Sequence, residues 1–362
     1  MKQQTNVKQL LLLTGVGLLF GLLVSEIVLR LLQPPQLAVA RQPCIYLPDE
    51  QIGYRYAPQA VDKISRNFNI DNVVQINALG FHDIEHDPAE SGRYPRVLVV
   101  GDSFTAALQV PVEAGWSQIA ENELSQNGHT SAEIINLGLD GTGTDVHLAL
   151  IQQYLPQFQP DIVVVAFYEN DITDALSGLK FRECYKGHYV LTYQNVEQRD
   201  SLRNAIDLNE PTALARWLFE HIYLARLFFL RTGNIIFQTN YITPSWIDIS
   251  VEENQNSDQD YVDRLFENLI ALEQEQAFQL LIIPVPTKSD AGESLTRLEQ
   301  TLSQSTREQL TILNLVPVMT ELQTTNDLVY EQLFWEFDGH FNETGNRIFG
   351  LAVARAIQEY VE

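Results

Sequence analysis

Cysteine and basic residues are scarce in this chain of 362 residues. Only two cysteines are present, Cys44 and Cys184, which is too few for a disulfide framework. Lysine and arginine total 23 against 47 aspartates and glutamates, so the net charge is −24. Such an acidic surface repels a phosphate backbone, and nucleic acid is therefore not an expected partner. The seven histidines are scattered without zinc-site spacing, and the sequence predicts neither a metal site nor a bound cofactor.

One long apolar stretch lies near the N-terminus. Residues 10–24 are almost entirely apolar, and the apolar character continues to Leu32 with interruptions at Glu26 and Arg30. A membrane span needs about 20 apolar residues, and this stretch suffices if the two charged side chains lie near the interface. We therefore expect a single transmembrane anchor over residues 9–33.

The flanks of this stretch predict its orientation and the compartment of the remaining chain. Lysines within residues 1–8 precede it, which makes these residues a cytoplasmic tail and places everything later outside. The alternative is a cleaved signal peptide, because Ala-Val-Ala at 38–40 matches a small-residue cleavage pattern. Both interpretations place the bulk of the chain in the periplasm or at the cell surface. A disulfide between Cys44 and Cys184 is chemically possible there, although the sequence does not show whether the two are close.

Short apolar runs alternate with helical patterns over most of the remaining chain. The runs that predict buried strands lie at 97–100, 133–137, 161–167, 279–285 and 311–315. The helical patterns lie at 116–124, 146–154, 261–274, 295–309 and 343–360, the last with Asn342 as its expected N-cap. Strands that alternate with helices predict an α/β fold, in which a doubly wound parallel sheet has helices on both faces.

Two regions interrupt this alternation. Residues 34–92 are expected to form a linker and a small accessory region, in which short strands cover one end of the core. Residues 176–255 form an insertion, which is either a lid beside the site or simple packing on an exposed sheet edge. The core is therefore expected in two pieces, 93–175 and 256–362.

The first strand ends in a turn that contains a serine. Gly101-Asp102-Ser103-Phe104-Thr105 follows the apolar run, at the sheet edge where open α/β folds bind ligands. A helix that begins just after Ser103 offers backbone N–H groups and partial positive charge to an oxyanion. Ser103 is therefore either a nucleophile or an ordinary N-cap, and this stretch alone does not decide between them.

Three later loops at the same edge of the sheet carry polar groups. The loop after the second strand has three glycines in six residues, among them Gly141, and its backbone can approach a ligand closely. Asn170 follows the third strand and can donate an amide hydrogen bond, although it also suits an N-cap. Asp338 lies two residues before His340, where it can fix the tautomer of the imidazole. Together the four loops hold the complete set of groups for acyl transfer.

Other histidines are weaker candidates for this chemistry. Asp145 and His147 could form a rival pair, but they lie at the start of a helical pattern, where Asp is a common cap. His82 and His86 lie among acidic residues and predict a solvated, charged loop rather than a metal site.

The four blocks resemble the SGNH (GDSL-type) hydrolase family, which is named for its Ser, Gly, Asn and His blocks. The resemblance implies a flavodoxin-like three-layer α/β/α sandwich around a five-stranded parallel sheet. It also implies a triad of Ser103, His340 and Asp338, with an oxyanion hole formed by Ser103, Gly141 and Asn170. The implied activity is hydrolysis of an acyl or acetyl ester on a glycan or a small molecule.

Two departures from the family pattern bear on the substrate. Tyr168 stands where the third block usually has glycine, which could narrow the cleft or exclude bulky acyl groups. Only Gly339 separates Asp338 from His340, a spacing similar to that of membrane-anchored or periplasmic proteins of alginate O-acetylation. The spacing also leaves Glu336 as an alternative to Asp338 behind the imidazole.

These features leave two alternatives to an extracytoplasmic esterase. One is a polysaccharide O-acetyltransferase of the same fold, which receives acyl groups from a membrane protein. The other is a non-catalytic glycan-binding or assembly protein that retains the fold.

Overall fold

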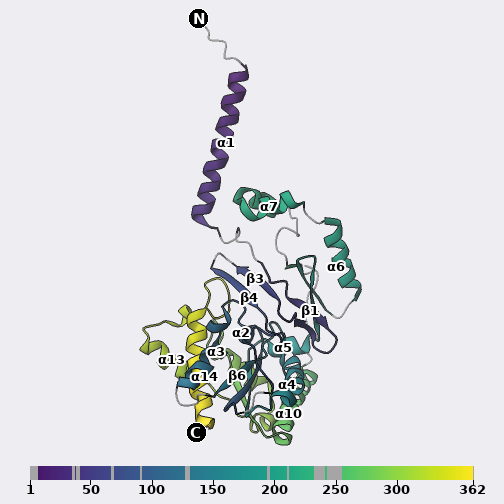
Figure 1. Cartoon of the computed structure of the whole chain (residues 1–362), viewed down its shortest axis with the longest axis vertical. Helices are drawn as coiled ribbons and strands as arrows, with labels where there is room; N and C mark the ends of the chain where they lie inside the picture. Colours follow the sequence, from purple (N-terminus) through teal and green to yellow (C-terminus); the bar gives the residue numbers. More distant parts are fainter. Residues whose placement is uncertain are drawn as a thin grey trace.

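A four-stranded parallel sheet forms the centre of the protein (Figure 1). The computed structural model describes residues 7–34, 37, 41–66, 69–89, 92–126, 131–193, 196–209, 212–231, 241–242 and 255–361. The sheet has the order β11-β7-β5-β6 and consists of β5 (Arg96–Gly101), β6 (Glu133–Asn136), β7 (Ile162–Phe167) and β11 (Gln279–Pro284). Every residue of β5, β6 and β7 is buried, as expected for parallel strands covered on both faces.

The fifth predicted strand is reduced to a single bridge, so the prediction of five strands is wrong by one. In the segment 311–315, only Ile312 bridges to Ile282 of β11, in parallel orientation. The chain then leaves the sheet, because the Asn314 side chain accepts a hydrogen bond from the Val316 amide at 3.0 Å and α13 (Val316–Thr325) begins. When this bridge is counted as the fifth position, the strand order is that of flavodoxin-like folds.

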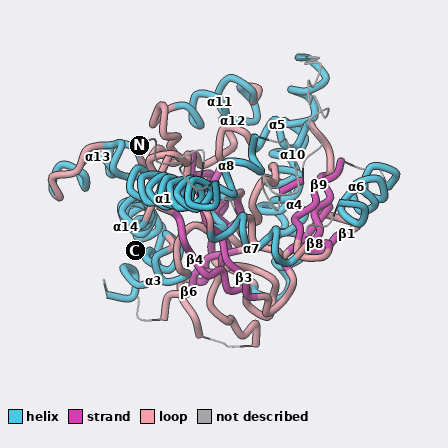
Figure 2. Tube along the Cα trace, turned by 90° about the horizontal axis from the view of Figure 1, so that it is seen from above, coloured by secondary structure: helices cyan, strands magenta, loops and turns pink. Residues whose placement is uncertain are grey.

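The two faces of the sheet form two apolar clusters. Val97 and Val99 of β5 belong to one cluster, whereas Leu98 and Val100 belong to the other, because successive side chains of a strand point to opposite faces. The covering helices are α3 (Trp116–Gln126), α13 and α14 (Glu343–Val361) on the first face, and α4 (Thr144–Phe158), α10 (Gln255–Glu275) and α11 (Glu293–Thr301) on the second. Figure 2 shows helices on both sides of the strands, and the predicted three-layer α/β/α fold is confirmed.

Side-chain caps mark the start of α14 and the break in the helix that was predicted at 295–309. The Asn342 side chain accepts a hydrogen bond from the Gly345 amide at 3.0 Å, as predicted for the N-cap of α14. The helical pattern at 295–309 is interrupted, because α11 ends at Thr301 and α12 (Gln304–Arg307) begins separately. Ser303 makes this break by accepting a hydrogen bond from the Thr306 amide at 3.3 Å.

Antiparallel hairpins form the accessory region and part of the insertion. The pairs are β1 (Tyr46–Asp49) with β2 (Gly53–Tyr56), β3 (Val61–Arg66) with β4 (Ile70–Gln75), and β8 (Lys180–Tyr185) with β9 (His188–Tyr193), to which β10 (Tyr241–Ile242) adds in parallel. A disulfide joins Cys44 to Cys184 of β8, with the two Cα atoms 5.1 Å apart. The accessory region and the insertion are therefore covalently linked.

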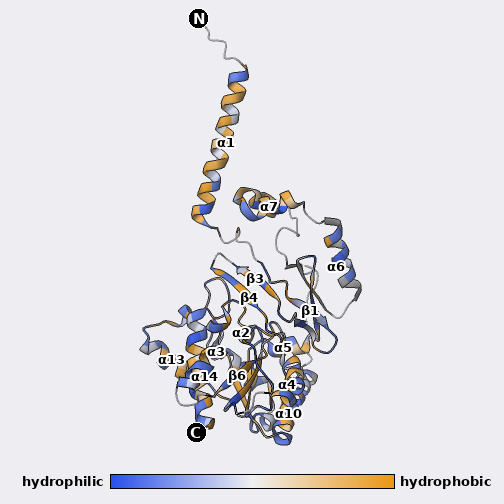
Figure 3. Cartoon of the chain, in the orientation of Figure 1, coloured by the Kyte–Doolittle hydropathy of each residue, from blue (hydrophilic) through white to orange (hydrophobic). Residues whose placement is uncertain are grey.

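A long helix, α1 (Val7–Leu32), projects from the globular part of the protein (Figure 1). It is mostly apolar (Figure 3) and is long enough to cross a membrane, although a signal sequence passes the same test. The insertion also contributes α6 (Val196–Asn209), α7 (Ala213–His221) and α8 (Tyr223–Arg231). The possible cleavage pattern at 38–40 and most of the predicted tail lie outside the described residues.

Candidate active site

A serine, a histidine and an aspartate form a hydrogen-bonded row at the carboxyl edge of the sheet. Ser103 is the first residue of α2 (Ser103–Ala106), directly after β5, and its Oγ lies 2.8 Å from Nε2 of His340. The other ring nitrogen of His340, Nδ1, is hydrogen-bonded to Oδ1 of Asp338. The same carboxylate oxygen accepts the His340 backbone N–H at 3.0 Å. The structure therefore brings together residues that are more than 230 positions apart in the sequence, with Asp338 rather than Glu336 behind the imidazole.

Asp102, and not Ser103, caps the short helix α2. Its Oδ1 accepts a hydrogen bond from the Phe104 amide at 2.9 Å, which satisfies one of the unpaired N–H groups of the first turn. The Ser103 hydroxyl is not used as a cap and lies 2.8 Å from His340 Nε2, with Asp102 Oδ2 farther away at 3.3 Å. Asp102 is fully buried, and this burial raises the pKa of its carboxyl to about 6.

Two cations hold the loop that carries Asp338 and His340. Arg66, at the end of β3, donates a hydrogen bond to Oδ2 of Asp338 at 2.8 Å. Burial raises the pKa of Asp338, but the hydrogen bond from His340 and the charges of His340 and Arg66 hold it well below its usual range. Lys288, in the loop after β11, donates to the backbone carbonyls of Trp335 and Glu336, at 2.6 Å each. The Asp338 carboxylate is therefore ionised and fixed in place.

The predicted oxyanion-hole glycine, Gly141, lies against a buried arginine. Gly141 has a φ of +71°, and a Cβ atom there would come within 2.0 Å of the Arg182 guanidinium. The neighbouring carboxylate of Asp140 binds this guanidinium and accepts hydrogen bonds from the hydroxyls of Tyr46 at 3.1 Å and Tyr56 at 2.6 Å. Arg182 belongs to β8 of the insertion, so the insertion and the accessory hairpins together form the wall behind the glycine loop.

Asn170, the predicted amide donor, lies at the start of α5 (Asp171–Leu176). Its side chain makes no capping hydrogen bond, so its use as an N-cap is not observed. Its Nδ2 is 3.4 Å from Asp174 Oδ2, and its Oδ1 is buried without a partner among the described residues. Within the same part of the chain, no hydrogen bond joins Asn170 or Gly141 to Ser103.

Tyr168, the departure from the family pattern, packs in a group of aromatic rings next to His340. Its ring stacks on Phe104 with the ring centroids 4.3 Å apart, and the Phe104 ring lies 5.0 Å from that of His340. The space beside the Ser103–His340 pair is therefore bordered by aromatic rings.

The comparison with protein families decides the assignment. The GDSL-like lipase/acylhydrolase family matches residues 97–353, which is most of the chain. The chain belongs to this family of ester-hydrolysing enzymes. The resemblance drawn from the four sequence blocks is therefore confirmed.

The GDSL-family chain is also similar to individual known proteins. It is 34% identical to an arylesterase of Vibrio mimicus over 83 residues, which cover 23% of this chain and 41% of that protein. A structure of a putative lipolytic protein of the G-D-S-L family from Desulfitobacterium hafniense shares 13% identity over 72% of this chain and 98% of its own, with a TM-score of 0.36. An acetyl xylan esterase structure shares 15% identity over 74% of this chain and all of its own, with a TM-score of 0.38.

Three other histidines of the GDSL-family enzyme, His82, His86 and His147, have buried side chains. His147 does not pair with Asp145; its Nε2 lies 3.2 Å from the Thr142 hydroxyl, and burial lowers its pKa to about 3. The prediction of a solvated loop at His82 and His86 is wrong. His82 is buried, with Nδ1 at 2.8 Å from the Ala106 carbonyl, and His86 is enclosed between two carboxylates.

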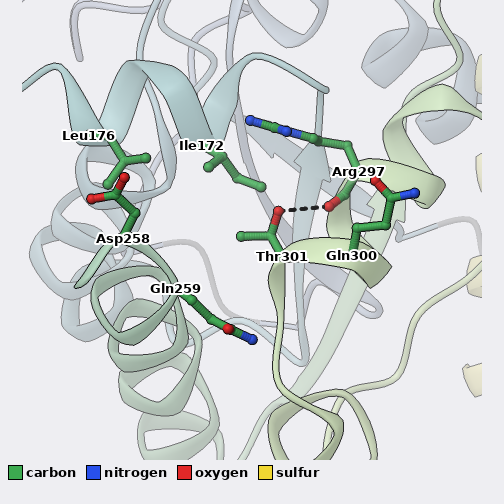
Figure 4. A pocket seen from close by; sticks show the side chains of 7 residues that line it. All are labelled: Ile172, Leu176, Asp258, Gln259, Arg297, Gln300 and Thr301. Carbon is green, nitrogen blue, oxygen red and sulfur yellow. Dashed lines mark hydrogen bonds between the residues drawn. The ribbon is translucent and has the colours of Figure 1, made fainter. Parts of the chain in front are cut away.

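Two neighbouring cavities, which we together call the polar hollow, lie near the segments that follow β7 and β11. One cavity of about 300 Å³ is shown in Figure 4 and is lined by Ile172, Leu176, Asp258, Gln259, Arg297, Gln300 and Thr301. A second cavity of about 450 Å³ shares Arg297 and Gln300 with the first and adds Glu169, the neighbour of Asn170. Hydroxyl, amide and carboxylate groups predominate in the second cavity, which suits a ligand rich in hydroxyl groups.

Proposed function

We propose that this protein is an extracytoplasmic serine esterase that removes small acyl groups from a glycan or a small ester. The observation that carries the proposal is the continuous hydrogen-bonded row from Ser103 through His340 to Asp338. This row supplies a nucleophile, a base and an acid that orients the base.

The proposed reaction begins at the Ser103 hydroxyl. His340 Nε2 accepts the hydroxyl proton while Oγ attacks the ester carbonyl carbon. The tetrahedral oxyanion is held by the backbone N–H groups of Ser103 and Gly141 and by the Asn170 amide, and each such donor is worth about 3 kcal/mol. His340 then protonates the departing alcohol, which leaves an acyl group on Ser103. Water, deprotonated by His340, attacks this acyl-enzyme, releases the carboxylic acid and restores Ser103.

Two features support a small acyl group on a polyhydroxylated alcohol. The Tyr168 ring, stacked on Phe104, occupies space beside the Ser103–His340 pair. The polar hollow that includes Glu169 lies next to the Asn170 loop and offers hydrogen-bond partners to sugar hydroxyls.

Contacts at the end of α1 support a retained membrane anchor over a cleaved signal peptide. The Glu26 carboxylate accepts hydrogen bonds from two amides of α8, and Arg226 of α8 is hydrogen-bonded to the carbonyl of Leu37, which is buried. A peptide removed after residue 40 would take these contacts with it.

Hydrolysis of p-nitrophenyl acetate by the full chain tests the esterase. We expect Ser103→Ala to remain folded and to lose at least 1,000-fold in kcat, because removal of a triad member leaves only residual catalysis. Ser177→Ala is the matched control, because Ser177 is half-buried and its hydroxyl bonds only to the Thr173 carbonyl. Full activity in a folded Ser103→Ala variant would refute the assigned nucleophile.

The same assay with an added oligosaccharide separates the esterase from the O-acetyltransferase. The esterase releases acetate at a rate that the oligosaccharide leaves unchanged. Transfer of acetyl groups to the sugar faster than their release to water would favour the transferase and overturn hydrolysis as the main reaction.

A further inference from the structure

The helices α7 and α8 meet the end of α1 through polar contacts. The Glu26 carboxylate accepts hydrogen bonds from the amides of Tyr223 at 3.0 Å and Leu224 at 2.9 Å, and so caps the start of α8. Arg30, which pairs with Glu26 at 2.8 Å, donates to the carbonyl of His221 at the end of α7. Figure 1 shows α7 beside this end of α1. The junction of α7 and α8 is therefore fixed at the level of the last turns of α1.

The length of α1 gives the depth of this junction in a membrane. The 26 residues of α1 extend about 39 Å, whereas the hydrocarbon layer is about 30 Å thick. Glu26 lies about 29 Å along the axis from Val7, at the far boundary of the hydrocarbon when the span begins there. In a membrane crossed by α1, the Glu26–Arg30 pair, and the α7–α8 junction with it, would therefore lie at the membrane–water interface.

Several apolar side chains of α7 and α8 are exposed. Leu214 is 67% exposed, Trp217 is 49% exposed and Phe228 is 64% exposed. Leu214 and Trp217 are three residues apart, so they lie on one face of α7. The Trp217 ring stacks on the ring of His221, and such amphipathic rings are enriched where a membrane meets water. We call Leu214, Trp217 and Phe228 the apolar patch. Without lipid, this patch would be exposed to water next to the end of a membrane helix.

The same two helices are basic, although the chain as a whole is acidic. Residues 213–231 contain three arginines and one glutamate, against a net charge of −24 for the chain. Arg226 is buried and bonds to the Phe219 carbonyl at 2.9 Å and the Glu220 carbonyl at 2.6 Å, which holds α7 against α8. The other two arginines, Arg216 and Arg231, outnumber Glu220, so this aromatic pair of helices is slightly basic and complements the anionic headgroups of a lipid surface.

We propose that α7 and α8 form an interfacial element, which lies on the membrane crossed by α1 and places Leu214, Trp217 and Phe228 against lipid. The inference rests on the proposed role of α1 as a retained membrane span. The core is then held to the membrane at two places, by the span and by a surface helix pair. This arrangement restricts its rotation and keeps the catalytic edge close to the lipid surface.

Environment-sensitive labels on the full chain test this placement. Both native cysteines are joined in the disulfide, so Leu214→Cys or Phe228→Cys introduces a single reactive thiol for an NBD fluorophore. In vesicles of phosphatidylcholine and phosphatidylglycerol that contain doxyl-labelled lipid, we expect at least a twofold loss of fluorescence at both positions. Tyr360→Cys is the matched control, because Tyr360 is 40% exposed near the C-terminus, at the opposite end of the molecule from α1 (Figure 1). Its label should keep its fluorescence.

A label at Leu18, in the middle of α1, separates the possible outcomes. Quenching at Leu18, Leu214 and Phe228, with none at Tyr360, supports the interfacial element. Quenching at Leu18 alone would overturn it while leaving the anchor intact, and would indicate that a protein partner or a second copy covers the patch. A Leu18 label that remains unquenched would overturn both the anchor and the interfacial element. Hydrolysis of p-nitrophenyl acetate by the same samples reports separately on the proposed esterase.

Discussion

His340 and, after it, Arg66 keep a negative charge on Asp338 next to the His340 imidazole. The Asp338 carboxylate is shared between His340 and Arg66, and its pKa is held well below the usual range despite burial. It therefore stays ionised and can stabilise the imidazolium that forms when Ser103 loses its proton. Arg66 does not touch the reacting atoms and acts as a positioning residue.

Replacement of Arg66 by methionine should lower kcat/KM for p-nitrophenyl acetate about tenfold. A hydrogen bond to a charged group is worth about 1.5–3 kcal/mol, and about 1.4 kcal/mol corresponds to a factor of ten. Arg66→Lys should recover part of the loss. The control is Arg55→Met, since Arg55 is an exposed residue of the same accessory region and lies 3.9 Å from Asp49. Equal activity of Arg66→Met and the wild type would exclude a positioning role for Arg66.

The buried His86 should make the stability of the protein depend on pH. Its ring nitrogens lie 2.9 Å from Asp83 and 3.0 Å from Glu133. Burial lowers the pKa of His86, but the hydrogen bonds and charges of the two carboxylates raise it from 6.5 to about 9. Because the folded pKa lies above the unfolded one, this contribution is complete below about pH 6.5 and is lost as the pH rises through about 9.

The expected contribution of His86 is roughly 3 kcal/mol at low pH, at about 1.4 kcal/mol per pKa unit. Urea unfolding of the full chain in detergent should show His86→Gln less stable than the wild type at pH 6, with a gap that narrows towards pH 9. His221→Gln is the control, because His221 is exposed and bonds to a backbone carbonyl. A gap that stays constant from pH 6 to pH 9 would contradict a charged, buried His86.

The residues that could be predicted from sequence are those next to element boundaries. Ser103 and Asn170 each follow an apolar strand, and His340 precedes a helix, so their positions at the sheet edge follow from the alternation of elements. Arg66 and Lys288 have no such local feature, because their partners are reached only when distant loops meet in the fold. The prediction for His86 was wrong because acidic neighbours in the sequence usually indicate a solvated loop. In the fold, His86 is instead enclosed by Asp83 and by Glu133, which is 47 positions away in the sequence.

At the scale of elements, the loop after β6 depends on a wall supplied by other parts of the chain. Gly141 has a positive φ and lies against Arg182 of β8, while Asp140 ties Arg182 to the tyrosines of β1 and β2. The insertion therefore supports the backbone that is proposed to bind the oxyanion. This contact favours a supporting role for β8 over packing that is unrelated to the site.

Alanine at Gly141 should impair catalysis more than alanine at Gly187. Both glycines have a positive φ, of +71° and +78°, so both variants should lose about 1–2 kcal/mol of folding free energy. Only at Gly141 does the added methyl group meet Arg182, whereas nothing lies within 4 Å at Gly187. We expect Gly141→Ala to lower kcat for p-nitrophenyl acetate more than tenfold and Gly187→Ala to leave it nearly unchanged. Equal kcat values for the two variants would show that the Arg182 wall does not shape the site.

The disulfide should stabilise the link between the accessory region and β8. Cys44 and Cys184 are 140 positions apart, so the bond restricts a long loop of the unfolded chain. The double variant Cys44→Ser/Cys184→Ser should lose about 2–5 kcal/mol of unfolding free energy in urea titrations. Reduction of the wild type by dithiothreitol should produce the same shift in midpoint, and an unchanged midpoint after complete reduction would contradict this role.

Secondary structure could be predicted best where burial dictates composition. The centres of the four paired strands are apolar because both faces of the sheet are covered, and such runs are visible in the sequence. The segment at 311–315 also contains apolar residues, but Asn314 and Pro317 start a helix after a single bridge, so the ladder is not extended. Hairpin-like alternation over 181–193 predicted the pairing of β8 with β9, whereas the contact of this hairpin with the accessory region depends on tertiary packing, which local pattern does not encode.

For the whole molecule, the proposed anchor and the proposed active site belong to different parts of one chain. The core is proposed to bind its substrate at the carboxyl edge of the sheet, where other open α/β folds bind ligands. The accessory region and the insertion fix the loops of that edge through Arg66 and Arg182, and the insertion also contacts α1 through α8. The fold class and the family followed from the order of strands, helices and four short motifs, whereas the supporting contacts required the structure.

Covalent labelling by a fluorophosphonate tests the central claim most directly. The reagent forms a stable adduct with an activated serine, and peptide mass spectrometry of the full chain identifies the residue that carries it. We predict one adduct, on the peptide that contains Ser103, with labelling abolished in Ser103→Ala and retained in Ser177→Ala. Folded protein that carries no adduct, or an adduct on another serine, would contradict the assignment of Ser103 as a nucleophile activated by His340.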